Sequence, residues 1–156
     1  MKIQLIAVGT RMPVWVQTAY ADYAARLPRE SALVLKEIAV AERGKNADLA
    51  RLKRDEGEKI LKALPRDATV IALDEHGTQW DSVALSAQLK SWLASGRDTA
   101  LLIGGPDGHA PEVLARADKT WALSKLTLPH ALVRVLVAEQ LYRAHSILTN
   151  HPYHRA

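Results

Sequence analysis

Apolar residues along the chain follow two spacings that alternate from one end to the other. Five runs are nearly continuous in apolar and β-branched residues, which is typical of buried strands: Ile3 to Gly9, Leu33 to Val40, Thr69 to Asp74, Thr99 to Gly105 and Thr120 to Ser124. The segments that follow them carry apolar residues three and four positions apart, the spacing of a helix face: Val14 to Leu27, Asp48 to Leu64, Asp81 to Ala94, Pro111 to Ala117 and Ala131 to Leu148. Alternating strands and helices predict an α/β fold, a mostly parallel five-stranded sheet with helices on both faces.

The sequence favours one domain over residues 1–156, because no repeat, low-complexity tract or linker interrupts the alternation. Hydrophobic residues make up 48% and charged residues 24%, which is ordinary for a soluble globular protein. No run of about 18 apolar residues could span a membrane, and the chain opens on a strand-like segment rather than a signal peptide. The absence of cysteine excludes disulfides and thiolate metal sites. We therefore expect a cytoplasmic protein that does not bind membranes.

The loop Gly104 to Gly108, GGPDG, follows the fourth predicted strand and precedes a helical pattern, so it is a strand-to-helix crossover. Its glycines serve either a tight turn or a ligand that lies against the backbone. In open parallel sheets, ligands bind outside the carboxyl ends of the strands. Three such ends are unusual here, namely LDEHG, IGGPDG and LSKLTLPH. Together they predict one pocket.

The motifs that are absent narrow the ligand of this pocket. The glycine-rich loop lacks the Lys-Ser/Thr pair of a Walker A loop and is not G-x-G-x-x-G, which disfavours a triphosphate or a dinucleotide. No nucleophile elbow is present, which disfavours hydrolysis. A pocket of backbone and apolar side chains suits a small flat ligand such as a nucleoside.

The positive charge of the chain is concentrated between Arg43 and Arg66. This basic segment holds eight Lys or Arg residues and four acidic residues, an excess equal to the whole net charge of +4. It is either a solvated helix face or the surface that meets a polyanion.

The segment Ala131 to Leu148 is apolar around most of its circumference, as expected for a helix that is buried on all sides. We expect a symmetric homodimer to cover it, and the alternative is that its own chain wraps around it. Glu139 and Arg143 have the spacing of an i,i+4 ion pair. Arg134 has no such local partner, so it is the candidate for reaching across a dimer interface or towards RNA.

Several sequence blocks, in order, resemble the bacterial ribosomal large-subunit methyltransferase H family, within the SPOUT class of knotted methyltransferases. They are KIQLIAVGTRMPVWV, ERGKNAD, LLIGGPDG, LSKLTLPH, LVRVLVAEQLYRA and the terminal TNHPYHR, and they span essentially the whole chain. Two positions depart from the family. Ala131 stands where proline is common, and His109 stands where an apolar residue is common.

The resemblance implies an enzyme that takes a methyl group from S-adenosyl-L-methionine and places it on N3 of a pseudouridine in helix 69 of 23S ribosomal RNA, within the ribosome. It also implies a homodimer and a C-terminal trefoil knot. The implied donor-binding positions are at the same three strand ends, which favours the ligand interpretation of the glycine-rich loop: Leu73, Gly104, Leu123, Ser124, Lys125, Leu126, Thr127 and Leu128.

The C-terminal tail holds the candidate catalytic residues Tyr153, His154 and Arg155. His154 could take the N3 proton, Arg155 could hold a phosphate or an anion, and Tyr153 could stack on an extruded base. Two histidines without cysteine or a nearby carboxylate make a weak zinc signal, so we expect no metal site. For His130, at a predicted helix start, capping and lining of the donor pocket remain alternatives.

Two other functions compete with the methyltransferase. A non-catalytic RNA-binding module would keep the basic segment but would not need three glycine- and proline-marked strand ends. A nucleotide-binding regulatory protein would need a phosphate motif, which the sequence lacks.

Overall fold

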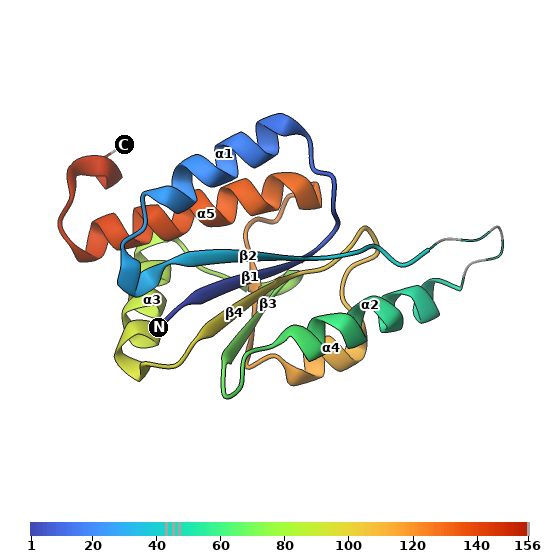
Figure 1. Ribbon diagram of the computed structural model, residues 1–156. Helices are drawn as coiled ribbons and strands as arrows, with labels where there is room; N and C mark the ends of the chain where they lie inside the picture. The colour runs from blue at the N-terminus through green and yellow to red at the C-terminus, as the bar shows by residue number, and fades with distance from the viewer. Residues whose placement is uncertain (43, 45, 47, 156) are drawn as a thin grey trace.

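The strands of the computed structural model, which describes residues 1–42, 44, 46 and 48–155, form one parallel sheet (Figure 1). They are β1 (Ile3–Val8), β2 (Leu33–Ile38), β3 (Thr69–Gln79), β4 (Thr99–Ile103) and β5 (Lys119–Ala122). The strand order across the sheet is β2-β1-β4-β3-β5, and every pairing is parallel. The predicted five-stranded α/β architecture is confirmed.

Helices cover both faces of the sheet, as Figure 1 shows. They are α1 (Val14–Ala25), α2 (Leu49–Ala63), α3 (Ser82–Ser95), α4 (Pro111–Arg116) and α5 (His130–Leu148), with short 3-10 turns η1 (Arg29–Ser31) and η2 (Pro152–Arg155). The expected start signals are confirmed, since the Asp81 carboxylate accepts from the Ala84 N–H at 2.7 Å and Pro111 lies in the first turn of α4.

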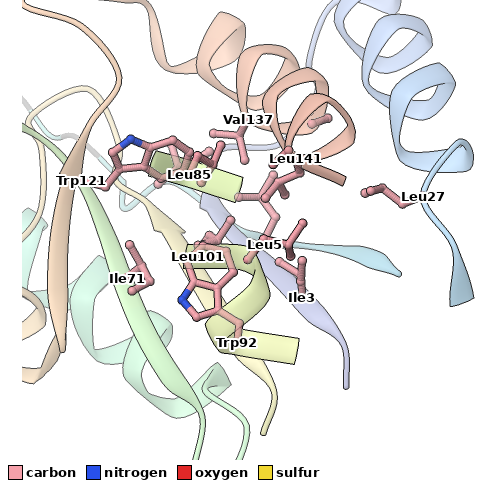
Figure 2. Close-up of a cluster of buried hydrophobic side chains, with 14 of the residues drawn as sticks. Ile3, Leu5, Leu27, Ile71, Leu85, Trp92, Leu101, Trp121, Val137 and Leu141 are labelled. Carbon is pink, nitrogen blue, oxygen red and sulfur yellow. The ribbon is translucent and has the colours of Figure 1, made fainter. Parts of the chain in front are cut away.

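Two hydrophobic clusters lie on opposite faces of the sheet, because successive side chains of a strand point to opposite sides. The larger cluster, shown in Figure 2, lies between the sheet and helices α1, α3 and α5. Leu5, Leu101 and Trp121 of the strands pack there with Trp92 of α3 and Leu141 of α5. The smaller cluster packs under α2 and α4 and draws on the neighbouring residues of the same strands.

Helix α5 lies between α1 and α3 on this larger cluster. None of its residues falls in the exposed class, although only one chain is present. The chain itself therefore covers much of the apolar circumference of α5, as in the alternative to the homodimer. The homodimer stays a prediction, and so does the trefoil knot.

Strand β3 is longer than expected, because it continues past Asp74 to Gln79. Its pairing with β5 shifts register between Leu73 and Thr78, so the intervening residues bulge out of the ladder. Gly77 in this bulge lies against β5: a Cβ there would come within 2.7 Å of backbone atoms of Thr120 and Trp121. The glycine therefore permits a close approach of two strands at the edge of the predicted pocket.

Candidate functional site

A cavity of about 350 Å³ lies where β4, β3 and β5 end. All three strand ends chosen from the sequence contribute to it. Seven of the eight expected donor-binding positions line it: Leu73, Gly104, Leu123, Ser124, Leu126, Thr127 and Leu128. Lys125 is exposed and is not among the described lining residues. His130 lines the cavity too, and helix α5 has no side-chain cap at its start. Of the two roles considered for His130, capping and lining of the donor pocket, the lining role fits the structure.

The glycine-rich loop folds back on itself at the mouth of β4. Gly108 has a positive φ of 82°, and its N–H donates to the carbonyl oxygen of Gly105 at 3.0 Å. A Cβ on Gly104 would come within 2.9 Å of the Gly108 carbonyl carbon, and one on Gly105 within 3.0 Å of Glu56 Oε1. The backbone of the turn therefore requires glycine at position 104, whereas Gly105 is packed against the side chains of Glu56 and Val8, and both residues line the cavity.

The loop between β5 and α5 forms another part of the cavity wall. The Ser124 hydroxyl accepts from the Leu126 N–H at 2.9 Å, which closes a local turn. Leu126 is 74% exposed although it lines the cavity. An apolar side chain this exposed at a cavity rim is available to a ligand or to a second chain.

The carboxylate side chains that line the cavity come from β3 and from the glycine-rich loop. Asp74, Glu75 and Asp107 line it. Trp121 is buried, and its indole N–H has no partner among the described residues. The cavity wall thus offers negative charge and an unused hydrogen-bond donor.

His109 also lines this cavity, although it is not among the site residues predicted from the sequence. Its Nε2 lies 3.1 Å from the carbonyl oxygen of Leu102. Burial lowers the pKa of His109, so the ring is neutral near pH 7, with the proton on Nε2 facing that carbonyl. Nδ1 then has a lone pair and no partner among the described residues. In the sequence, the only signal for a role of His109 in the site was that an apolar residue is common at this position in the family.

The C-terminal tail packs on α5 as the turn η2. The Tyr153 hydroxyl donates to Glu139 Oε1 at 2.9 Å, and its ring lies 4.6 Å from that of Tyr142. Burial raises the pKa of Tyr153 above its usual range, with the hydrogen bond to Glu139 as the next cause, so the phenol is neutral. His154 Nδ1 lies 3.3 Å from the Ser146 hydroxyl.

The tail and the cavity lie apart within one chain. The cavity contains His130, the first residue of α5, whereas His154 contacts Ser146, sixteen positions later. At 1.5 Å per residue this separation is about 24 Å along the helix. Figure 1 shows the tail at the end of α5 away from its first residue. One chain therefore does not bring the two predicted halves of the site together.

The two arginines of α5 differ in their partners. Arg143 pairs with Glu139 at 2.7 Å, as its spacing predicts. Arg134 is only 2% exposed and donates to Glu37 Oε2 at 2.6 Å and to the Gly9 carbonyl oxygen at 2.7 Å. The partners that Arg134 lacked on its own helix are therefore supplied by other parts of its own chain, and contact with a second chain or with RNA stays a prediction.

The basic segment is carried largely by α2, while Arg43 and Lys45 lie outside the described residues. Leu52, Gly57 and Ile60 are buried, with Gly57 against α4, and most of the basic side chains of α2 face solvent. The helix adjoins the cavity loop, since Glu56 Oε1 lies near Gly105 and the charge of Lys53 acts on His109. Over the described residues, no helix is long and apolar enough to cross a membrane, and no group of three His, Cys, Asp or Glu could hold a metal ion.

Comparison with known proteins gives a family and a fold. A family model described as "Predicted SPOUT methyltransferase" matches residues 1–154. The chain is 58% identical to a ribosomal RNA large subunit methyltransferase H of Thioalkalivibrio sulfidiphilus, over 99% of each protein. A solved structure of a probable methylase family protein from Haemophilus influenzae has a similar fold, with a TM-score of 0.55, 14% identity, and coverage of 97% of this chain and 67% of that one.

Proposed function

The chain belongs to the SPOUT methyltransferase family, and from that premise we propose that it methylates 23S ribosomal RNA within the ribosome, at N3 of a pseudouridine in helix 69, with S-adenosyl-L-methionine as donor. The observation that carries the proposal is the cavity at the ends of β3, β4 and β5, lined by seven of the eight expected donor-binding positions. The name of the 58% identical relative supports ribosomal RNA as the substrate.

The lining of this cavity suits a cationic nucleoside. The carboxylates of Asp74, Glu75 and Asp107 favour the positive sulfonium and ammonium groups of the donor. Backbone groups of the two glycine- and serine-containing loops, with Trp121 Nε1 and His109 Nδ1, offer hydrogen bonds to its adenosine. When bound, the donor supplies an activated methyl group. What this chain adds is alignment of that methyl with the acceptor nitrogen, which is the largest contribution to such a reaction.

His154 is the tail residue suited to taking the N3 proton. The Ser146 hydroxyl donates to the Arg143 carbonyl oxygen at 2.7 Å, so its oxygen is left to accept from the Nδ1–H of His154. That tautomer leaves the lone pair on Nε2 as the base. Tyr153 is neutral and positions the tail through Glu139, and Arg155 is exposed and can meet a phosphate.

A second copy of the chain would bring a tail to the cavity that its own chain leaves without one. Apolar side chains at the carboxyl edge of the sheet are available for such a contact, since Trp15 is 58% exposed and Val14 and Leu126 are more exposed still. The functional unit we propose is a homodimer in which each tail serves the partner's cavity.

Two measurements test this function. Calorimetric titration should show that the protein binds S-adenosylmethionine, and a protein that binds ribosomes but not the donor would instead be an RNA-binding module. Mixing a donor-site variant with a chain lacking residues 153–156 should restore about a quarter of native activity, since half the dimers are mixed and each has one intact site. Mixed dimers without activity would contradict the shared site.

A further inference from the structure

A second cavity, of about 260 Å³, lies at the carboxyl ends of β1 and β2, where α1 and α5 pack side by side (Figure 1). Its polar lining residues are Arg11, Gln17, Tyr20, Glu37 and Arg134. At about 30 Å³ per water it has room for about nine waters, which is close to the number of non-hydrogen atoms in a pyrimidine base.

Two buried hydrogen-bond donors in this cavity lack protein partners. Arg134 uses both terminal nitrogens, but its Nε–H has no partner among the described residues. The hydroxyl of Tyr20, a residue 9% exposed, also has none. Burial raises the pKa of Tyr20, so this hydroxyl keeps its proton. A buried donor without an acceptor is destabilising, so the pair favours a ligand that presents two acceptor oxygens.

Two further groups complete the pattern. Arg134 bonds to Oε2 of Glu37, whose side chain is 37% exposed, so the carboxylate can also accept an N–H from a bound molecule. Arg11 is exposed and adds a positive charge at the same cavity. A carboxylate together with two donors matches a group in which an N–H lies between two carbonyls.

The second cavity lies next to the donor cavity. The Cβ position of Gly9 is 3.5 Å from Arg134 Nη2 and 3.7 Å from His130 Nε2. Arg134 lines the second cavity, whereas His130 lines the first. A nucleotide in the second cavity would therefore lie beside the bound donor, at the same edge of the sheet.

We propose that this second cavity binds a uridine-type nucleotide of the acceptor RNA, neighbouring the nucleotide that is methylated. The inference rests on the proposed function. The carbonyl oxygens of the uracil ring accept from Tyr20 and Arg134, its N3–H donates to Glu37, and Arg11 meets the phosphate. Reading of an unstacked base by hydrogen bonds to its edge is the usual way in which proteins recognise single-stranded RNA.

The test is an NMR titration of the native protein with uridine 5′-monophosphate, followed at the Nε–H resonance of Arg134. We expect saturable shifts, weaker binding of cytidine 5′-monophosphate, and a further loss for ribose 5-phosphate. Tyr20→Phe should weaken uridine 5′-monophosphate binding about 2- to 10-fold, the effect of one lost hydrogen bond. Thr99→Val is the matched control, because it removes another buried hydroxyl without a partner among the described residues. Thr99 begins β4, so it lies at the amino ends of the strands, away from the second cavity.

Three results would overturn the inference. They are no shift at millimolar uridine 5′-monophosphate, equal shifts with ribose 5-phosphate, and equal weakening by Tyr20→Phe and Thr99→Val. Titration of the same sample with S-adenosylmethionine separates the two claims: donor binding without nucleotide binding rejects the second cavity alone, and absent donor binding rejects the proposed function.

Discussion

Gly104→Ala tests the donor site with the smallest possible side chain. The added Cβ would lie 2.9 Å from the Gly108 carbonyl carbon and 3.1 Å from the His109 nitrogen, both of them backbone atoms that cannot rotate away. The loop must open, which breaks the hydrogen bond from Gly108 N–H to the Gly105 carbonyl and costs about 0.5–1.5 kcal/mol of unfolding free energy. Misaligning one or two backbone bonds to the donor should raise its Kd about 10- to 100-fold.

Calorimetric titration with S-adenosylmethionine measures this effect, and urea unfolding measures the stability cost. Gly44→Ala is the control, because no atom lies within 4 Å of a Cβ at that position. It should leave both quantities near native values, within about 0.5 kcal/mol. Donor affinity within about twofold of native for Gly104→Ala would refute the assignment of this loop to the donor site.

Three other perturbations probe separate parts of the account. Burial lowers the pKa of His109, so at mildly acidic pH the unfolded chain takes up a proton at this residue that the folded chain does not. As the pH is lowered below the ordinary imidazole pKa of about 6.5, the free energy of unfolding should therefore decrease, by at most about 1.4 kcal/mol per pH unit. His109→Leu should remove that slope in urea unfolding, and an unchanged slope would show that His109 is not the cause. Tyr153→Phe should lower the methylation rate less than tenfold, because only the hydrogen bond to Glu139 is lost. Tyr153→Ala should also remove the ring contact with Tyr142, release the tail and lower the rate further, and both variants should keep native donor affinity. Equal rates for the two variants would show that Tyr153 does not position the tail. Charge reversal at the exposed residues Arg51, Arg54 and Lys59 should weaken ribosome binding and flatten its salt dependence without changing donor affinity. Native ribosome binding at physiological salt would leave α2 a solvated surface.

The fold followed from the sequence wherever the signals were local. Spacing of apolar residues identified all five strands and all five helices, and Asp81 capped α3 as expected. The end of strand β3 was missed because its last five residues, EHGTQ, carry no apolar side chain. Their strand conformation depends on pairing with β5, more than forty residues later in the chain. Similarly, α5 packs between α1 and α3, and the apolar pattern of α5 alone does not indicate which segments cover it.

The same division holds in the candidate site. The i,i+4 spacing of Glu139 and Arg143 predicted their ion pair correctly. The partner of Arg134 is Glu37, 97 positions away, and no local spacing points to it. The departure of His109 from the apolar residue common in the family did not identify it as a site residue, because its place in the cavity depends on the tertiary fold. The separation of tail and cavity likewise depends on the length and direction of α5.

The central claim is that this chain transfers a methyl group to one base of ribosomal RNA. Ribosomes that lack the modification, incubated with the protein and methyl-labelled S-adenosylmethionine and then digested to nucleosides, give the most direct test by mass spectrometry. We predict one new nucleoside, N3-methylpseudouridine, released from helix 69 of 23S ribosomal RNA. Label on another base or another RNA, or no label at all with active protein, would contradict the account.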